Sequence, residues 1–162
     1  SIGDDTIVMH LRSGDNYHRI FEPPTNYVPN PLIFYLNLID SFDKCILITE
    51  PDRENPIVHE LMKIDKVKIQ SSTVADDFAT LMSARNVALS GVGTFAMAAA
   101  LCSTRIKNLY TTNLLLTEHL NYSMMHNTDV ELHVMDLENY LPVFPCSWKN
   151  TEEQRKFILD YR

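Results

Sequence analysis

The stretch TIVMHLRSGD, residues 6–15, decides the fold, because it carries a buried strand straight into a charged turn. Residues 6–11 are mostly apolar, which is typical of a strand that is buried on both faces of a parallel sheet. The next four residues, Arg12 to Asp15, bring an arginine, a glycine and an aspartate to the end of this strand. The stretch is therefore either a strand that runs into a solvated turn or a strand end that is built to hold an anion.

Further apolar runs follow at the spacing of a sheet whose strands alternate with helices. They cover residues 44–50, 66–70, 86–90, 106–112 and 130–136, the last as a sixth strand or an edge segment. Strands separated by helices favour parallel pairing, and crossovers of this kind are nearly always right-handed. The sequence therefore predicts an α/β fold: a Rossmann-like, doubly wound, mainly parallel sheet with helices on both faces.

Start signals place the first four helices between these strands. The Asn-Pro pairs at 30–31 and 55–56 each offer an asparagine N-cap followed by proline at the first helical position. Ser72 or Thr73 can cap a third helix. A glycine-rich turn then leads into an Ala-rich helix within residues 91–103.

The sequence TEEQ, residues 151–154, is typical of the start of a last helix. Neither an internal repeat nor a low-complexity segment interrupts the alternation before it. The sequence thus predicts a Rossmann-like domain over residues 1–150 and a C-terminal helix over residues 151–162.

The net charge of the chain limits the classes of partner that it can bind. The chain of 162 residues carries a formal net charge of −7, whereas nucleic acids and anionic membranes require a broad cationic surface. We therefore expect no nucleic-acid partner. No apolar stretch reaches the roughly 18 residues that a membrane span needs, so no membrane span is expected in this chain. One small pocket for a phosphate is compatible with the same charge.

The topology predicts where a ligand would bind. Ligands of open α/β sheets bind beyond the carboxyl ends of the strands, at the point where the strand order reverses. In the common order 3-2-1-4-5, this switch point lies between the first and fourth strands. The segment HLRSGD, residues 10–15, follows the first strand, and SGVGTF, residues 90–95, follows the fourth. We therefore expect the two segments to meet across one crevice.

The second segment has the features of a turn that approaches a phosphate. Gly91 and Gly93 allow the backbone close to a ligand, and Thr94 and Phe95 lie at the start of the next helix. Free N–H groups and the helix dipole favour an anion there. The segment is neither a P-loop nor the GxGxxG fingerprint, and a short glycine-rich turn before a helix is also common without any ligand.

The first segment supplies the complementary charge. Arg12 offers a planar fork for two phosphate oxygens, and His10 lies on the same face of the extended chain as Arg12. The plainer interpretation is a solvated arginine, with Asp15 closing the turn after Gly14.

Together the two segments resemble the GDP-fucose-dependent fucosyltransferases, the superfamily of α1,2-, α1,6- and protein O-fucosyltransferases. HLRSGD at 10–15 is similar to the strand-end motif HxRxxD or HxRxG of that family. DFATLMSARNVALSGVGTF at 77–95 is similar to its helix, buried strand and Ser/Thr-Phe turn. The resemblance covers about residues 6–110 and corresponds to the C-terminal, donor-binding half of a GT-B fold, which has two Rossmann-like domains.

The resemblance implies a function for each motif residue. Residues 1–150 would bind a GDP-sugar, with GDP-fucose expected, and the sugar would pass to an acceptor hydroxyl with inversion. Arg12 takes the position of the arginine that binds the donor diphosphate and stabilises the leaving GDP. His10 would contact the nucleotide or phosphate, and the rest of the donor site would comprise Gly14, Gly91, Gly93, Thr94 and Phe95. The family implies no cofactor and no obligatory metal.

Acidic residues complete the implied site. Asp76 or Asp77 would accept hydrogen bonds from guanine, although both also complement the dipole of their helix. An inverting transferase must activate an acceptor hydroxyl. Asp15 is the local candidate for this base, and the base can equally lie in another domain.

The chain departs from the family in two ways. Ser13 stands where the α1,2 and α1,6 branches usually carry a second arginine, which is closer to the protein O-fucosyltransferase pattern. A GT-B enzyme also needs an N-terminal acceptor domain for its glycan or protein acceptor, so the resemblance implies that such a domain is missing here. The last helix would then dock on that domain, and a stripe of its side chains would lack a partner in this chain: Phe157, Ile158 and Tyr161.

Other interpretations stay open. The chain is alternatively a non-catalytic module that binds a nucleotide or nucleotide sugar, or an α/β scaffold for protein association whose motifs are turns. Residues 17–19 either face the sugar or form a surface loop. The family implies the lumen of the secretory pathway in a eukaryote and the cytoplasm in a bacterium, and the sequence does not decide between them.

Overall fold

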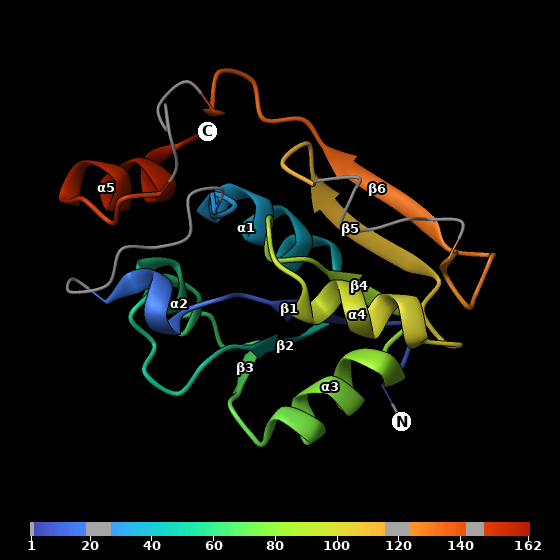
Figure 1. The fold of residues 1–162 in the computed structure, drawn as a ribbon. Helices are drawn as coiled ribbons and strands as arrows, with labels where there is room; N and C mark the ends of the chain where they lie inside the picture. Colours follow the sequence, from blue (N-terminus) through green and yellow to red (C-terminus); the bar gives the residue numbers. More distant parts are fainter. Residues whose placement is uncertain (1, 19–26, 116–123, 142–147) are drawn as a thin grey trace.

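The computed structural model describes residues 2–18, 27–115, 124–141 and 148–162, and these form an α/β domain around a six-stranded parallel sheet (Figure 1). The strands are β1 (Thr6–His10), β2 (Lys44–Ile48), β3 (Val67–Gln70), β4 (Asn86–Ala88), β5 (Asn108–Thr112) and β6 (Glu131–Met135). Their order is β3-β2-β1-β4-β5-β6. The predicted fold class is confirmed, and β6 joins as a parallel edge strand beside β5.

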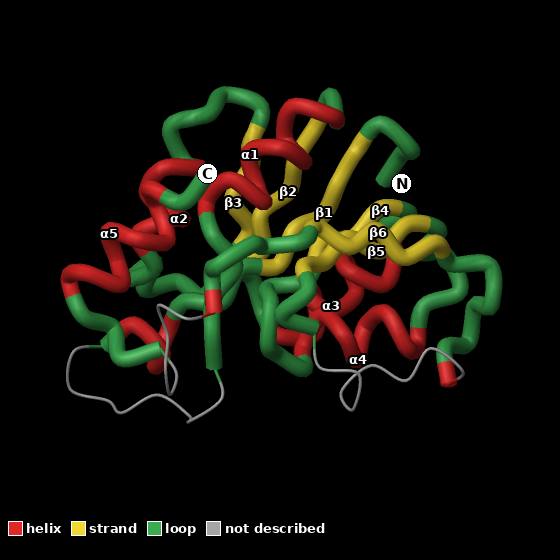
Figure 2. Tube along the Cα trace, turned by 90° about the horizontal axis from the view of Figure 1, so that it is seen from above, coloured by secondary structure: helices red, strands yellow, loops and turns green. Residues whose placement is uncertain are grey.

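Helices cover both faces of the sheet. They are α1 (Leu32–Ser41), α2 (Pro56–Leu61), α3 (Val74–Ser83), α4 (Phe95–Cys102) and α5 (Glu152–Asp160), with a short 3-10 helix at Gly14–Tyr17. Figure 2 shows α3 and α4 on one side of the sheet and α1, α2 and α5 on the other. No helix in the described part of the chain is long and apolar enough to cross a membrane.

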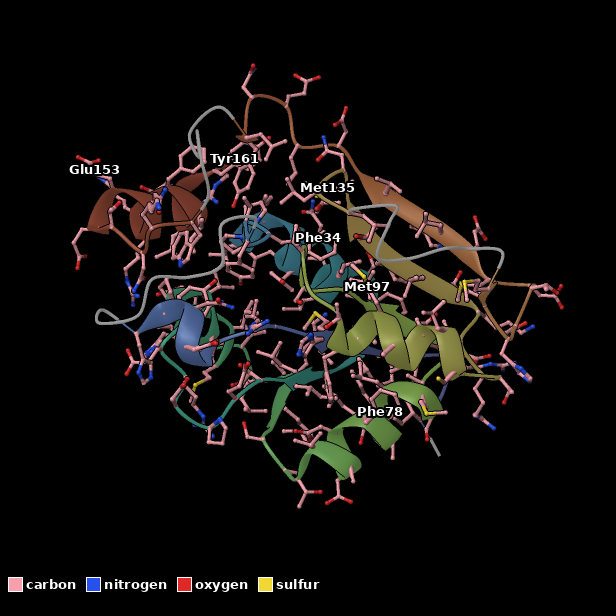
Figure 3. All side chains as sticks on the ribbon, in the orientation of Figure 1. Phe34, Phe78, Met97, Met135, Glu153 and Tyr161 are labelled. Carbon is pink, nitrogen blue, oxygen red and sulfur yellow. The ribbon has the colours of Figure 1, made fainter. Side chains whose placement is uncertain are left out.

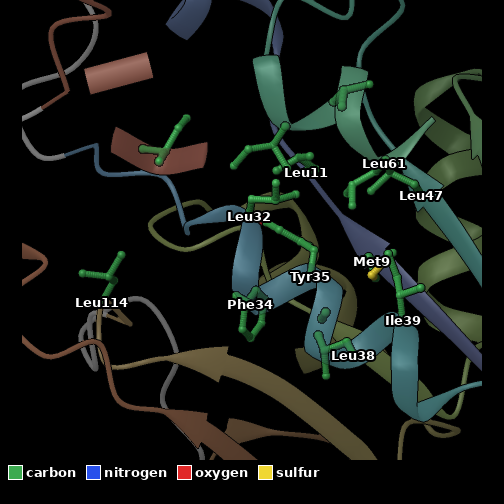
Figure 4. Close-up of a cluster of buried hydrophobic side chains, with 14 of the residues drawn as sticks. Met9, Leu11, Leu32, Phe34, Tyr35, Leu38, Ile39, Leu47, Leu61 and Leu114 are labelled. Carbon is green, nitrogen blue, oxygen red and sulfur yellow. The ribbon is translucent and has the colours of Figure 1, made fainter. Parts of the chain in front are cut away.

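Strand β1 lies at the centre and separates two hydrophobic clusters. Its side chains alternate, so Ile7 and Met9 pack with α1 and α2, whereas Val8 packs with α3 and α4. All five residues of the strand are buried. Figure 4 shows Met9 among the side chains of α1 and β2. Because neither face of β1 meets water, apolar residues follow one another along the strand, as the sequence shows.

The two Asn-Pro signals have different outcomes. Asn55 caps α2 as predicted, because its side chain accepts a 2.9 Å hydrogen bond from Ile57 N. Asn30 does not cap α1, which begins one residue later than predicted, after Pro31. The Asn30 amide instead donates to Leu89 O at 3.1 Å, and its oxygen accepts from Thr112 Oγ1 at 2.7 Å. It therefore ties the segment before α1 to the ends of β4 and β5.

The C-terminal helix docks on the chain's own domain. Ile158 is fully buried, and α5 contacts α1 and α2. Tyr140 packs its ring against Phe157 at 5.3 Å and against Tyr161 at 4.9 Å between centroids. Figure 3 shows Glu153 pointing outward from α5 and Tyr161 at its inner end. The expectation that this apolar stripe lacks a partner in the chain is wrong.

This packing predicts a large cost for truncating Ile158. Ile158→Ala should lower the free energy of unfolding by about 3 kcal/mol, because it removes buried methyl groups and leaves a cavity. Urea unfolding followed by circular dichroism measures the loss, and Glu153→Ala on the exposed face of α5 is the control. A loss below about 0.5 kcal/mol for Ile158→Ala would mean that α5 does not pack on this domain in solution.

Candidate functional site

A cavity of about 270 Å³ lies beyond the carboxyl ends of the central strands, on the side covered by α3 and α4. Four loops line it, those that follow β1, β2, β3 and β4. Its lining residues are His10, Arg12, Ile48, Thr49, Glu50, Pro51, Ser72, Val74, Asp77, Gly93, Thr94 and Phe95. Since the strand order reverses between β1 and β4, the cavity occupies the predicted switch point.

The cavity brings together residues from both motif segments. Six of the predicted site residues line it: His10, Arg12, Asp77, Gly93, Thr94 and Phe95. Residues 10–12 and 93–95 are more than eighty positions apart in the sequence. The juxtaposition therefore arises from the sheet order alone, as the topology predicted.

His10 ends β1 on the same face as Val8, which places its ring against α4. Its ring centroid lies 5.3 Å from that of Phe95, and the side chain is 7% exposed. Burial, with a smaller contribution from the charge of Arg12, lowers the pKa of His10 to about 4. His10 is therefore neutral at pH 7. Its Nδ1 is buried, and no described residue forms a hydrogen bond with it.

Arg12 extends from the end of β1 with part of its guanidinium exposed. One terminal nitrogen, Nη2, lies 3.1 Å from Asp15 Oδ1. Its Nε is buried, and none of the described residues accepts a hydrogen bond from it. Thr49 Oγ1, on the same cavity lining, is also buried without a partner in the described part. Unpaired buried polar atoms are rare in folded proteins, and three of the seven found in the described part, on His10, Arg12 and Thr49, lie on the cavity lining.

The loop after β2 holds the end of β1 through a dense set of hydrogen bonds. Glu50 Oε2 accepts from Ser13 N at 2.6 Å. Asp52 Oδ1 accepts from Ser13 Oγ at 2.8 Å and from Gly14 N at 3.1 Å. Asn55 Nδ2 donates to Arg12 O at 2.8 Å. The carboxylates therefore satisfy backbone N–H groups, and the backbone of Arg12 is fixed from the neighbouring loop.

This network shifts two acid pKa values in opposite directions. Burial raises the pKa of Glu50 and the charge of Asp52 adds to the rise, although the N–H of Ser13 and the charge of Arg12 oppose it. For Asp52, burial also favours the neutral form, but hydrogen bonds from Ser13, Glu54 and Gly14 outweigh it and lower the pKa.

The start of α4 forms the opposite wall. Gly93 and Thr94 line the cavity, and Thr94 precedes the helix without using its side chain as a cap. The first N–H groups of a helix have no partner inside it, and the helix dipole favours an anion at this end. Phe95 packs on Phe78 at 5.6 Å between ring centroids, which holds the start of α4 against α3.

Asp77 lies at the cavity in the first turn of α3 and is nearly buried. Its Oδ1 accepts from Gln70 Nε2 at 2.8 Å, and both of its oxygens face Ser72 N, at 3.2 and 3.3 Å. Asp76 instead points to the exposed side of the helix, where it accepts from Thr73 Oγ1. Of the two predicted guanine-binding acids, the structure thus places Asp77 at the cavity.

Three other predicted site residues lie off the cavity lining. Gly91 adopts φ +88°, and a Cβ there would lie 3.0 Å from Val28 O, so it serves the close approach of the segment before α1. Gly14 adopts φ +57° in the turn that Asp52 binds. Asp15 is exposed and pairs with Arg12. Gly14 therefore supports the turn, and Asp15 orients Arg12.

For residues 17–19 the sequence left open a sugar-facing loop or a surface loop, and neither Tyr17 nor His18 is on the cavity lining. Tyr17 is 1% exposed, and its hydroxyl lies 3.2 Å from that of Tyr27 in the hydrophobic core. His18 is exposed and lies 3.6 Å from Asp52. Arg19 lies outside the described residues.

The sequence-based prediction missed Glu50 and Asp52. Both belong to ITEPDR, residues 48–53, where acids directly follow a buried strand that neighbours β1. That position was the available signal, since adjacent parallel strands bring their carboxyl ends to the same edge. On the cavity lining, Glu50 and Asp77 are the carboxylates and Arg12 is the cation.

Comparison with protein-family models, with curated proteins and with solved structures gave no match. Among residues 2–18, 27–115, 124–141 and 148–162, no group of three or more His, Cys, Asp or Glu is placed to hold a metal ion. The cavity itself is therefore the feature of this chain that points to a function.

The bond from Asn55 to Arg12 predicts an unusually costly cap substitution. Asn55→Ala should lower the free energy of unfolding by about 2–3 kcal/mol, since it removes the cap of α2 and leaves Arg12 O without its donor. Thr73→Ala removes the cap of α3 alone and should cost about 1 kcal/mol. Equal losses in urea unfolding would show that the bond to Arg12 contributes nothing.

The buried His10 predicts a loss of stability in acid. The unfolded chain binds a proton near the ordinary pKa of 6.5, whereas folded His10 binds it only near 4. The unfolded state therefore holds more protons between these values, so stability falls as the pH drops through this window. The full contribution is about 3 kcal/mol.

The measurement compares free energies of unfolding at pH 7 and pH 4.5. His10→Gln should lose about 2–3 kcal/mol less than the wild type over this range. His126→Gln, at an exposed position, serves as the control and should behave as the wild type. An identical pH dependence for His10→Gln and the wild type would contradict a buried, neutral His10.

Proposed function

We propose that this chain is the donor-binding domain of a glycosyltransferase that moves a sugar, with fucose expected, from a GDP-sugar to an acceptor hydroxyl with inversion. The observation that carries the proposal is the cavity at the switch point, where Arg12 faces the start of α4. The resemblance to the fucosyltransferases rests on the same two segments of the sequence.

The proposed chemistry follows from how charge develops in the reaction. When the sugar leaves, negative charge grows on the diphosphate of GDP. Arg12 and the N–H groups at Gly93, Thr94 and Phe95 are preorganised donors beside the space where that charge would lie. They would bind and stabilise the leaving group without an obligatory metal. His10, neutral and buried beside Phe95, would contribute a hydrogen bond to the nucleotide rather than a charge.

The proposal assigns the activation of the acceptor to another part of the enzyme. Asp15 was the local candidate for the base, but it is exposed, lies off the cavity lining and pairs with Arg12. Its position supports a role in orienting the guanidinium. An acceptor domain beyond the present sequence would then supply both the glycan or protein acceptor site and the proton acceptor.

A non-catalytic nucleotide-sugar module is the second candidate. The position of Asp15 off the cavity lining favours this candidate. The described lining then holds groups suited to binding a ligand and lacks an evident base for the acceptor. Transfer of fucose by a longer chain that carries an upstream domain separates the two candidates. The third interpretation, a scaffold for protein association, requires no nucleotide binding at all.

Calorimetric titration with GDP and GDP-fucose tests the shared requirement for a nucleotide site. Arg12→Ala should weaken GDP binding by about 2 kcal/mol, roughly 30-fold in Kd, because a charge-assisted contact to the diphosphate is lost. The matched control is Arg85→Ala, since Arg85 pairs with Asp4 at the opposite end of the sheet. It should bind GDP as the wild type does.

Two results would contradict the proposal. Unchanged GDP binding by Arg12→Ala would place the nucleotide elsewhere. The absence of heat and of any rise in melting temperature with millimolar GDP or GDP-fucose would favour the scaffold.

A further inference from the structure

The charge on the cavity lining does not match a diphosphate. Arg12 contributes one positive charge, whereas Glu50 and Asp77 contribute two carboxylates, and His10 is neutral. A GDP-sugar brings two more negative charges on its diphosphate. Like charges in a partly desolvated site repel strongly, and buried charge has to be compensated. A proton taken up with the ligand would reduce this repulsion and add to the stabilisation by Arg12 and the start of α4.

Glu50 is the group best placed to bind a proton and so remove one negative charge from the site. It lies on the same lining as Arg12, and its Oε2 is held by the N–H of Ser13 at 2.6 Å. A proton on Oε1 leaves that hydrogen bond intact, because the carbonyl oxygen of an uncharged carboxyl still accepts. Asp77 receives hydrogen bonds from Gln70 Nε2 and Ser72 N, and Glu50 from Ser13 N and its own N–H, but burial outweighs these donors at Glu50 and favours its protonated form.

The charged groups around Glu50 determine whether its carboxyl group is ionised or protonated. Arg12, at the end of β1, favours the ionised form, and Asp52, on the same loop as Glu50, favours the protonated form. A bound diphosphate would act in the same direction as Asp52. In the part of the chain that the structure describes, the other titratable or charged groups near Glu50 include Arg53 on the same loop, His10 on β1, Asp15 and His18 after it, Tyr27 before α1, and Asp77 on α3.

We propose that the cavity binds its GDP-sugar together with one proton and that Glu50 carries this proton. The proposal rests on the proposed function, because the diphosphate is the charge to which the proton responds. Uncharged Glu50 can donate a hydrogen bond from its O–H to a phosphate oxygen, where the carboxylate would repel it. Binding then becomes tighter as the pH falls, because the bound state holds more protons than the free state.

Calorimetry with GDP-fucose on the wild-type chain measures the proton directly. Both phosphates of this ligand are esterified or bridged, so the ligand itself does not titrate between pH 6 and pH 8. Titrations at pH 7 in PIPES and in Tris, which differ in ionisation enthalpy, should give an uptake of about 0.3–0.5 proton per bound ligand. The Kd should be about five- to tenfold lower at pH 6 than at pH 8.

Glu50→Gln reproduces the protonated form, because its amide keeps an oxygen for Ser13 N and presents a donor. This variant should bind GDP-fucose at pH 8 about as tightly as the wild type does at pH 6, without proton uptake. Glu54→Gln, an exposed neighbour, and His18→Gln, which removes the histidine beside Asp52, should both keep the wild-type pH dependence.

The outcomes separate this proposal from the proposed function. GDP-fucose binding without proton uptake, or a pH dependence that survives in a folded Glu50→Gln, overturns the role of Glu50 and leaves the nucleotide site intact. Loss of the pH dependence in His18→Gln would assign the proton to His18 instead. No binding of GDP-fucose at any pH overturns both proposals. If Glu50→Gln does not fold, the proton count on the wild type decides.

Discussion

The burial of β1 on both faces constrains the rest of this structure. All five residues of the strand are buried, so the polar groups that follow it must appear together at its carboxyl end. There they need partners, and the loop after β2 supplies them through Glu50, Asp52 and Asn55. The central position of β1, between β2 and β4, also fixes where the strand order reverses. The cavity lies where a fully buried strand ends in a polar, well-anchored turn.

The anchoring explains how an arginine stays available beside several acids. Glu50 and Asp52 use their oxygens on the N–H groups of Ser13 and Gly14, and are not salt-bridge partners of the guanidinium within 4.0 Å in the described part. Among the described residues, Asp15 alone pairs with Arg12, through one terminal nitrogen. A single exposed pair of this kind contributes little to stability, so a ligand with two oxygens could displace it at small cost. The acids thus shape the turn, while the buried Nε of Arg12 remains unpaired.

Sequence patterns predicted the sheet and the switch point, because apolar runs and helix starts are local signals. The Asn-Pro pairs that begin at Asn30 and Asn55 show the limit of what such local signals can predict. Both have the same local pattern, but the partners of Asn30 are Leu89 O and Thr112 Oγ1, from strands far along the chain. The same limit applies to Gly91, whose positive φ serves contact with Val28, and to α5, whose stripe meets Tyr140. Glu50 was missed because its neighbours exist only once β2 pairs with β1.

A second hollow, at the amino ends of the strands, can be compared with the cavity at Arg12 as a ligand site. A larger hollow of about 420 Å³ lies there, lined in part by Lys44, Lys66 and Lys68. However, Lys44 pairs with Asp5 at 2.6 Å and Lys66 donates to Phe42 O at 2.9 Å. None of its lining residues in the described part holds a buried polar atom without a partner. Size and positive charge favour that hollow, whereas unsatisfied donors and acceptors favour the cavity at Arg12. Three such atoms lie on the lining of the cavity at Arg12 and none lies on the described lining of the hollow, and this contrast favours the cavity as the ligand site.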